Sequence, residues 1–185
     1  MKLIAILIAV FFLNACEAQE AEAESTAFPY FSEEGGRVRD NANLLSEAFE
    51  ARLIARLDAA QERYGQQMAV VTVPSLNGYS IDDFSLAYAN AWRLGNAKRN
   101  DGIMMLVAPN EREVRIEIGL GLEANFPDDF CEEVLDSQIL PAFEAGEYEK
   151  GIASGTSALI ERMRAYPSMP TNDNDARSTR TKDAA

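Results

Sequence analysis

The 185-residue chain contains 30 Asp and Glu residues against 17 Lys and Arg residues, which gives a formal net charge of −13, and it contains no histidine. The absence of histidine excludes Ser-His-Asp and Cys-His hydrolases, histidine-ligated zinc sites and phosphoryl transfer through histidine. The negative charge argues against nucleic acid and anionic lipid as partners and in favour of cations, with solubility alone as the alternative explanation.

The first 15 residues have the pattern of a secretory signal peptide. Lys2 precedes the apolar run LIAILIAVFFL, residues 3–13, which is shorter than the roughly 20 apolar residues of a membrane-spanning helix. The following LNAC resembles a bacterial lipobox, in which cleavage precedes Cys16 and the cysteine sulfur carries diacylglycerol. An ordinary cleaved signal is the alternative. A lipidated Cys16, with acyl chains such as palmitate, predicts a lipoprotein anchored to a bilayer of the cell envelope and facing the periplasm or the exterior.

Polar segments flank one predicted domain at residues 37–166, which is an ordinary size for a single core. Residues 16–36 are rich in Glu and Ala and low in apolar bulk, which predicts an acidic tether between the lipid and the domain. Residues 167–185 contain no periodic apolar pattern and are predicted to be disordered.

The first half of the domain is predicted to contain two helices and a strand. The first helix starts at the cap Ser46 and runs to about Arg63. Its apolar residues recur every three or four positions: Leu45, Phe49, Leu53, Leu57, Ala60 and Tyr64. The β-branched segment QMAVVTV, residues 67–73, predicts a buried strand. Ser80, with Asp83 three residues later, predicts the start of a second helix.

Two further strands and two helices are predicted in the second half. IMMLVA, residues 103–108, has no polar residue, as in a strand covered on both faces, and EVRIEI, residues 113–118, alternates between apolar and polar. A turn between them predicts an antiparallel hairpin. A third helix capped by Asp128 or Asp129 and a fourth at about 148–163 follow. This order predicts an α/β fold, a three-layer-like sandwich whose small mixed sheet has a parallel first pair and an antiparallel hairpin and is flanked by about four helices.

The hairpin is predicted to bring acidic residues together at one edge of the sheet. The start of its first strand and the end of its second strand must lie side by side, which places residues 100–101 beside the glycine-rich GLGLE of residues 119–123. Calcium takes six to eight oxygen ligands from carboxylates, amides, carbonyls and water, so we predict a divalent-cation site here. The candidate metal ligands are Asp101, Asn100, Glu123 and Asp128. In the alternative interpretation, Asn100 and Asp101 lie in an ordinary turn and Asp128 is only a helix cap.

Five segments together resemble the TPM domain family: VRDNANLLS (38–46), VVTVPSLNGYSIDDFS (70–85), WRLGNAKRNDGIMMLVAPNEREVRIEIGLGLE (92–123), FPDD (126–129) and ILPAFEAGEYEKGI (139–152). The family includes bacterial membrane-tethered proteins and a plant thylakoid-lumen protein linked to photosystem II repair. The resemblance covers nearly all of residues 38–163 and implies an α/β sandwich with a small sheet. It also implies calcium binding, as described for some members, or acid phosphatase activity, as described for the plant relative; other members are described as lacking detectable enzymatic activity.

The resemblance adds Asp40 to the candidate metal ligands, because this residue matches the aspartate of the family's first motif. In the simplest topology, Asp40 lies near one end of the first predicted strand and Asp101 lies near the opposite end. Either the loop over residues 40–46 reaches back toward Asp101, or the domain has two acidic sites.

Residues and resemblance together predict a membrane-tethered lipoprotein that binds a divalent cation, with calcium as the first candidate, and that acts as an adaptor in membrane-protein maintenance. Its partners would be the bilayer, through Cys16, and a membrane protein. A metal-dependent acid phosphatase of the cell envelope is the alternative, although the chain has neither a D-x-D-x-T/V phosphoaspartate signature nor a P-loop. No catalytic residue is assigned.

Overall fold

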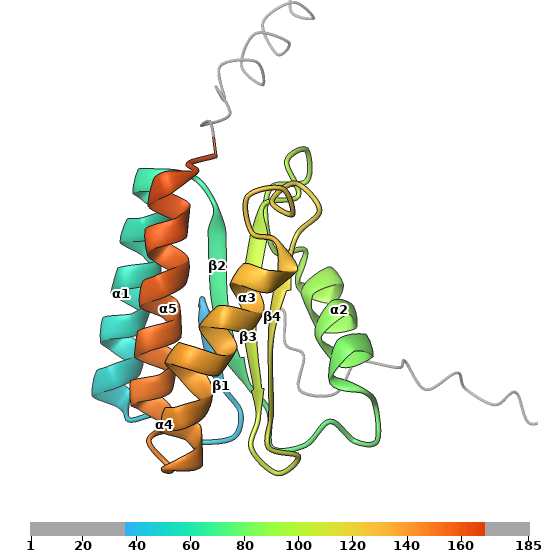
Figure 1. Ribbon diagram of the computed structural model, residues 1–185, viewed down its shortest axis with the longest axis vertical. Helices are drawn as coiled ribbons and strands as arrows, with labels where there is room; N and C mark the ends of the chain where they lie inside the picture. The colour runs from blue at the N-terminus through green and yellow to red at the C-terminus, as the bar shows by residue number, and fades with distance from the viewer. Residues whose placement is uncertain (1–35, 169–185) are drawn as a thin grey trace, which may run out of the picture.

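The computed structural model describes residues 36–168, which form a sheet with helices on both faces (Figure 1). The predicted signal peptide, Cys16 and nearly all of the predicted tether lie outside the described residues, and so does the tail from residue 169 onward. Within the described part of the chain, no helix combines the length and the apolar character needed to cross a membrane.

The described sheet has four strands in the order β1-β2-β3-β4. They are β1 (Val38–Asp40), β2 (Gln67–Thr72), β3 (Gly102–Ala108) and β4 (Glu113–Ile118). The first three strands run parallel, and β4 pairs antiparallel with β3. The predicted mixed sheet is therefore confirmed. β1 is an addition to the three predicted strands, because three residues are too few to show a period of two.

The composition of each strand follows from its place in the sheet. β3 lies between two other strands, and all seven of its residues are buried. β4 lies at the edge, and its apolar side chains join the larger core: Val114, Ile116 and Ile118. Its polar side chains turn to the opposite face, where Arg115 pairs with Asp82 at the start of α2. The predicted alternation of this strand is confirmed.

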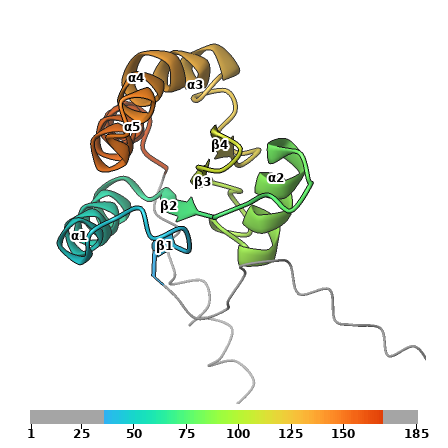
Figure 2. The same ribbon diagram turned by 90° about the horizontal axis from the view of Figure 1, so that it is seen from below.

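The helices form two layers (Figure 2). One layer contains α1 (Glu47–Tyr64), α3 (Asp128–Val134), α4 (Leu140–Glu144) and α5 (Tyr148–Ala165). The other layer is α2 (Ile81–Trp92), which packs on β3 and β4. The sheet between them buries one apolar cluster against each layer. Burial of apolar surface on both faces of β2 and β3 is the main force that holds the fold together.

The predicted helix caps at Ser46 and Ser80 are confirmed. The hydroxyl of Ser46 accepts the Phe49 N–H at 3.3 Å at the start of α1, and the hydroxyl of Ser80 accepts the Asp83 N–H at 3.1 Å at the start of α2. Gly65 ends α1 with a φ of 90°, a left-handed conformation that glycine adopts without a steric cost.

The third helix differs from its prediction at both ends. Its cap residue is Pro127, and Asp128 lies inside the first turn, so the predicted aspartate cap is wrong. The carboxylate still interacts favourably with the positive end of the helix dipole from that position. At the other end, α3 continues through the π-helical turn η1 (Leu135–Ile139) into α4. Pro141 lacks an N–H and its ring crowds the preceding turn, which accounts for the wider turn at this point.

Candidate functional site at the edge of the sheet

The backbone at the open end of the hairpin is arranged as predicted. The Gly119 N–H donates to the Gly102 carbonyl at 2.8 Å, and the Gly121 N–H donates to the Asn100 carbonyl at 3.0 Å. A Cβ on Gly121 would lie 1.7 Å from the Arg99 carbonyl oxygen, and one on Gly119 would lie 2.2 Å from that of Asn100. Only glycine permits this approach, so the GLGLE segment serves close backbone packing.

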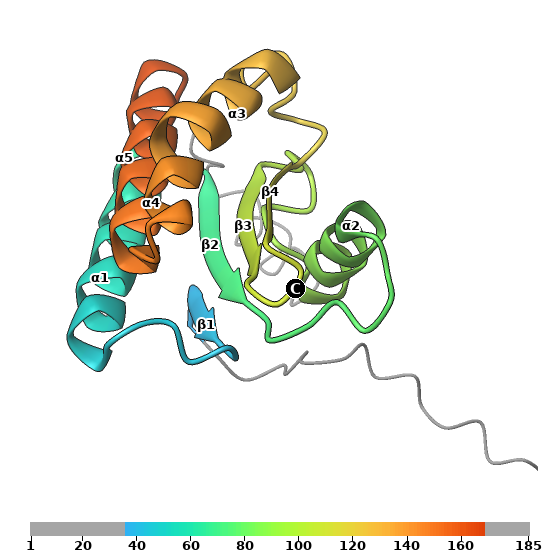
Figure 3. The ribbon, with the colours of Figure 1, turned by 60° about the horizontal axis from the view of Figure 1, so that its bottom comes forward.

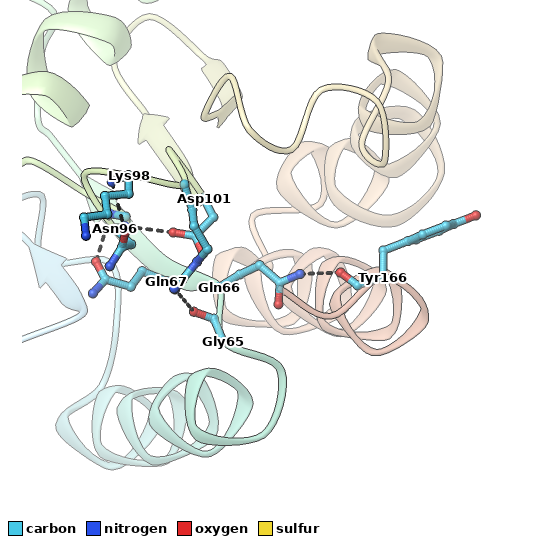
Figure 4. A network of polar contacts seen from close by, with 9 residues as sticks. Gly65, Gln66, Gln67, Asn96, Lys98, Asp101 and Tyr166 are labelled. Atoms are coloured by element: carbon cyan, nitrogen blue, oxygen red, sulfur yellow. Dashed lines mark hydrogen bonds and ion pairs between the residues drawn. The ribbon is translucent and has the colours of Figure 1, made fainter. Parts of the chain in front are cut away.

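Asp101 is buried in this packing and has its own partners. Its side chain is 1% exposed, and its carboxylate accepts the Asn96 backbone N–H at 2.8 Å and the Arg99 Nε–H at 2.6 Å. The Arg99 guanidinium also donates to the Gly65 carbonyl at 3.3 Å, which joins the end of α1 to the start of β3. Figure 4 shows Asp101 close to Asn96 in this network, with Gly65 nearby. A cation at Asp101 would therefore have to displace an arginine.

Asp40 lies at the other end of the sheet. Its carboxylate accepts the backbone N–H groups of Leu44 and Leu45 at 3.0 and 2.8 Å, and the Thr72 hydroxyl donates to it as well. Thr72 ends β2, whereas the Asp101 carbonyl accepts the N–H of Gln67 at the start of β2. The length of β2 separates the two carboxylates by roughly 17 Å at about 3.3 Å per residue. The loop does not reach back, and the two aspartates occupy separate places.

Asn100 and Glu123 share a cavity that excludes Asp101. Both residues are exposed and line a cavity of about 350 Å³ between α2 and the end of β4, together with Glu117. The carboxylate of Glu117 accepts the Ser85 hydroxyl at 2.8 Å and the Arg115 Nε–H at 3.0 Å. Among residues 36–168, no cluster of three or more Asp, Glu or Cys side chains has a geometry that could hold a metal ion.

Asp128 lines a second hollow, a groove of about 340 Å³ along β4. Figure 3 shows the ribbon of β4 between α2 and α3. Consecutive residues 114–118 line this groove, with Ile81 on one side and α3 residues on the other. Its acidic side chains are Glu117, Glu123, Asp128 and Glu132. The structure therefore places Asp101 in an internal ion pair and Asp40 in a loop at the far end of the sheet. The other three candidates line two neighbouring hollows, and Glu123 lines both, beside Asn100 in one and Asp128 in the other.

Cys131 also lines this groove but is not a reactive thiol. Its side chain packs in the larger core, and burial, followed by the charge of Asp128, raises its pKa to about 11. The thiolate is the nucleophilic form, and almost none is present at neutral pH.

Sequence reasoning missed Arg99, Glu117 and Glu132. Arg99 lies two positions before Asp101 and forms an ion pair with it. The short spacing of these opposite charges in the sequence was a signal that could have predicted the pair. Glu117 points from β4 toward α2, which its place in the alternating pattern indicates. Glu132 required the placement of α3 beside β4, which no local pattern provides.

The chain is similar in sequence and in structure to known proteins. A family model described as TPM domain matches residues 38–162, and no curated protein matches the chain. The N-terminal domain of a protein from P. gingivalis, solved by NMR, is 32% identical with a TM-score of 0.67, and the alignment covers 72% of this chain and 87% of that one.

Two more distant NMR structures share the fold. The BA42 protein of the psychrophilic bacterium Bizionia argentinensis is 17% identical with a TM-score of 0.60, over 70% of this chain and 88% of that chain. The N-terminal domain of the cg2496 protein from Corynebacterium glutamicum is 18% identical with a TM-score of 0.51, over 77% and 89%. At these identities, the likeness concerns the fold alone.

Proposed function

The chain belongs to the TPM domain family, and from this premise we propose that it is a lipid-anchored binding module of the cell envelope whose main ligand is a partner protein. The observation that carries the proposal is the acidic groove beside β4, which presents exposed carboxylates along an open sheet edge. Asp101, in contrast, is committed to Arg99 inside the fold. A surface that combines exposed carboxylates with unpaired strand backbone supports binding better than it supports catalysis.

Site-specific photo-crosslinking in intact cells tests this binding role. A photoreactive amino acid is placed at Glu132 in the groove or at Glu62, which is exposed on α1 in the opposite part of the fold. The proposal predicts one dominant protein adduct from the groove position and none from the α1 position. Equal adducts from both positions, or none from either, contradict a specific partner at this face.

A divalent cation is the second ligand of the proposal. Asn100 and Glu123, which line one cavity, supply an amide oxygen and a carboxylate, and water completes the shell of a hard cation such as calcium. Calorimetric titration with calcium tests the site, with Glu123→Gln as the variant and Asp129→Asn, on the exposed surface of α3, as the control. Heat of binding that persists in Glu123→Gln places the ion elsewhere.

A metal-dependent phosphatase is the second candidate, because the family that matches residues 38–162 is named after phosphatase activity. The reaction needs carboxylates that hold a metal ion, which activates water and neutralises the phosphoryl group. Release of phosphate from a generic monoester by the purified chain tests this candidate. The activity must disappear in EDTA and fall in Glu123→Gln; turnover that survives both changes contradicts it.

The anchor is proposed at Cys16, which lies outside the described residues. Metabolic labelling with palmitate must mark the full-length protein and must be lost in Cys16→Ser. Cys131→Ser is the matched control. Cys131 is buried in the core, and its replacement leaves the proposed lipid attachment at Cys16 intact. A label that remains in Cys16→Ser rules out this anchor.

A further inference from the structure

We propose that β4 accepts an extended, basic segment of the partner protein as an additional strand of the sheet. This inference rests on the proposed binding function and specifies the chemistry of the partner.

The outer side of β4 presents unused strand-pairing groups. The Gly119 N–H donates to the Gly102 carbonyl, so this pair is a hydrogen-bonded pair of the antiparallel ladder. Hydrogen-bonded and non-bonded pairs alternate along such a ladder. The backbone groups of three β4 residues therefore point away from β3: Val114, Ile116 and Ile118. Within residues 36–168, no strand pairs with this side of β4.

The groove beside these groups has room for a peptide. Its volume of about 340 Å³ borders residues 114–118 continuously, which spans most of the six-residue strand. Helix α2 bounds it through Ile81, and α3 bounds it through Cys131 and Glu132, with Phe126 before α3 and Leu135 after it completing that wall. An extended chain that adds to a sheet edge obtains affinity from main-chain hydrogen bonds and specificity from its side chains.

The charges beside the groove select a basic segment. Four carboxylates line it: Glu117, Glu123, Asp128 and Glu132. Its single guanidinium, Arg115, already contacts Asp82 at 2.7 Å and Glu117 at 3.0 Å. The remaining field is negative, so lysine and arginine side chains on an incoming strand are attracted and acidic ones are repelled.

The same charges argue against a second copy of this chain as the occupant. Edge-to-edge pairing of two copies would bring like carboxylates together. Charged side chains at a sheet edge are one means by which natural proteins prevent such association. The alternative within the chain is the tail, which carries Arg177, Arg180 and Lys182 beyond the described residues. Occupancy by the tail and occupancy by a partner give different results in the experiment below.

The experiment measures binding of a fluorescent peptide, acetyl-TKVRVKT-amide, to the full mature chain by fluorescence polarisation. The charge-reversed peptide acetyl-TEVEVET-amide must not bind. A basic peptide with N-methyl groups on alternate residues keeps its charge but loses the main-chain donors on one side. We expect it to bind at least about tenfold more weakly, because about three ladder hydrogen bonds are lost. Equal binding of the methylated and unmethylated peptides overturns strand addition.

Matched charge reversals on α3 locate the peptide. Glu132 lines the groove, whereas its neighbour Glu133 is exposed but does not line it. We expect Glu132→Lys to weaken binding about tenfold and Glu133→Lys to change it by less than about twofold. Circular dichroism and the unfolding midpoint must match the parent chain in both variants. An equal effect of both reversals indicates non-specific attraction and overturns the site.

Two further outcomes decide the occupant. Replacement of the three basic tail residues by alanine is expected to leave the affinity for the peptide unchanged. An affinity that rises more than about fivefold shows that the tail competes for the edge of β4, and it overturns the proposal that a partner protein occupies this edge. The photo-crosslinking described above separates this inference from the binding function itself. A partner that crosslinks at the groove while the basic peptide fails to bind refutes strand addition and leaves the adaptor role standing.

Discussion

The guanidinium of Arg99 lies 2.6 Å from the carboxylate of Asp101, and their side chains are 23% and 1% exposed, respectively. This ion pair ties the loop after α2 to the first residue before β3, and a further bond to the Gly65 carbonyl extends it to the end of α1. Asp101 is therefore part of the structural framework of the domain.

Replacement of Asp101 by alanine is expected to destabilise the fold by about 2 to 4 kcal/mol, because it leaves a partly buried arginine and the Asn96 N–H without their acceptor. Urea unfolding followed by the fluorescence of Trp92, the single tryptophan, measures the effect. Asp129→Ala on the surface of α3 is the control. Similar midpoints for the two variants contradict the structural role of Asp101.

Replacement of Gly121 by alanine is expected to cost at least about 1 to 3 kcal/mol. The new Cβ would lie 1.7 Å from the Arg99 carbonyl, so the backbone of the loop must shift. Gly36→Ala is the matched control, since its Cβ would lie 4.0 Å from the nearest side chain, an ordinary contact. Thermal unfolding compares the two variants. If Gly121→Ala unfolds at the parent temperature, the close approach of these segments is wrong.

Cys131 is expected to react slowly with thiol reagents at pH 8 in the folded chain and rapidly after unfolding in urea. Burial raises its pKa from 9.0 to about 11, which suppresses the reactive thiolate. The same shift makes stability fall as the pH rises from about 9 to about 11, where the unfolded chain releases the thiol proton and the folded chain retains it. A Cys16→Ser background leaves this thiol as the single reporter. Equal rates in the folded and unfolded chains contradict its burial.

Glu149 is expected to contribute to the loss of stability in acid. Its carboxylate accepts the Ser46 backbone N–H at 2.7 Å, and this bond lowers its pKa below the usual 4.5. A lowered pKa gives a contribution that is present above pH 4.5 and disappears as the pH falls through the folded value. Glu149→Gln should therefore show a shallower decline of the urea midpoint between pH 6 and pH 3 than the parent chain. Glu144→Gln, at the exposed end of α4, should leave the decline unchanged.

Local patterns in the sequence predicted most of the fold. The caps at Ser46 and Ser80, the unbroken apolar run of β3 and the alternation of β4 each depend on residues close together in the chain. The same patterns could not reveal β1, which has three residues and exists because it pairs with β2. They also missed the π-helical turn before α4, where a proline is accommodated within a continuing helix.

For the candidate site, the sequence alone determined which backbone segments meet, since an antiparallel hairpin forces residue 100 to lie beside residues 119–121. Only the tertiary structure decided where the carboxylates point. Asp101 turns into the fold toward Arg99, Asp40 stays at the far end of β2, and Glu132 reaches β4 from another helix. Backbone pairing follows from short-range geometry, whereas the direction of a side chain depends on every group packed around it, and those groups come from distant parts of the chain.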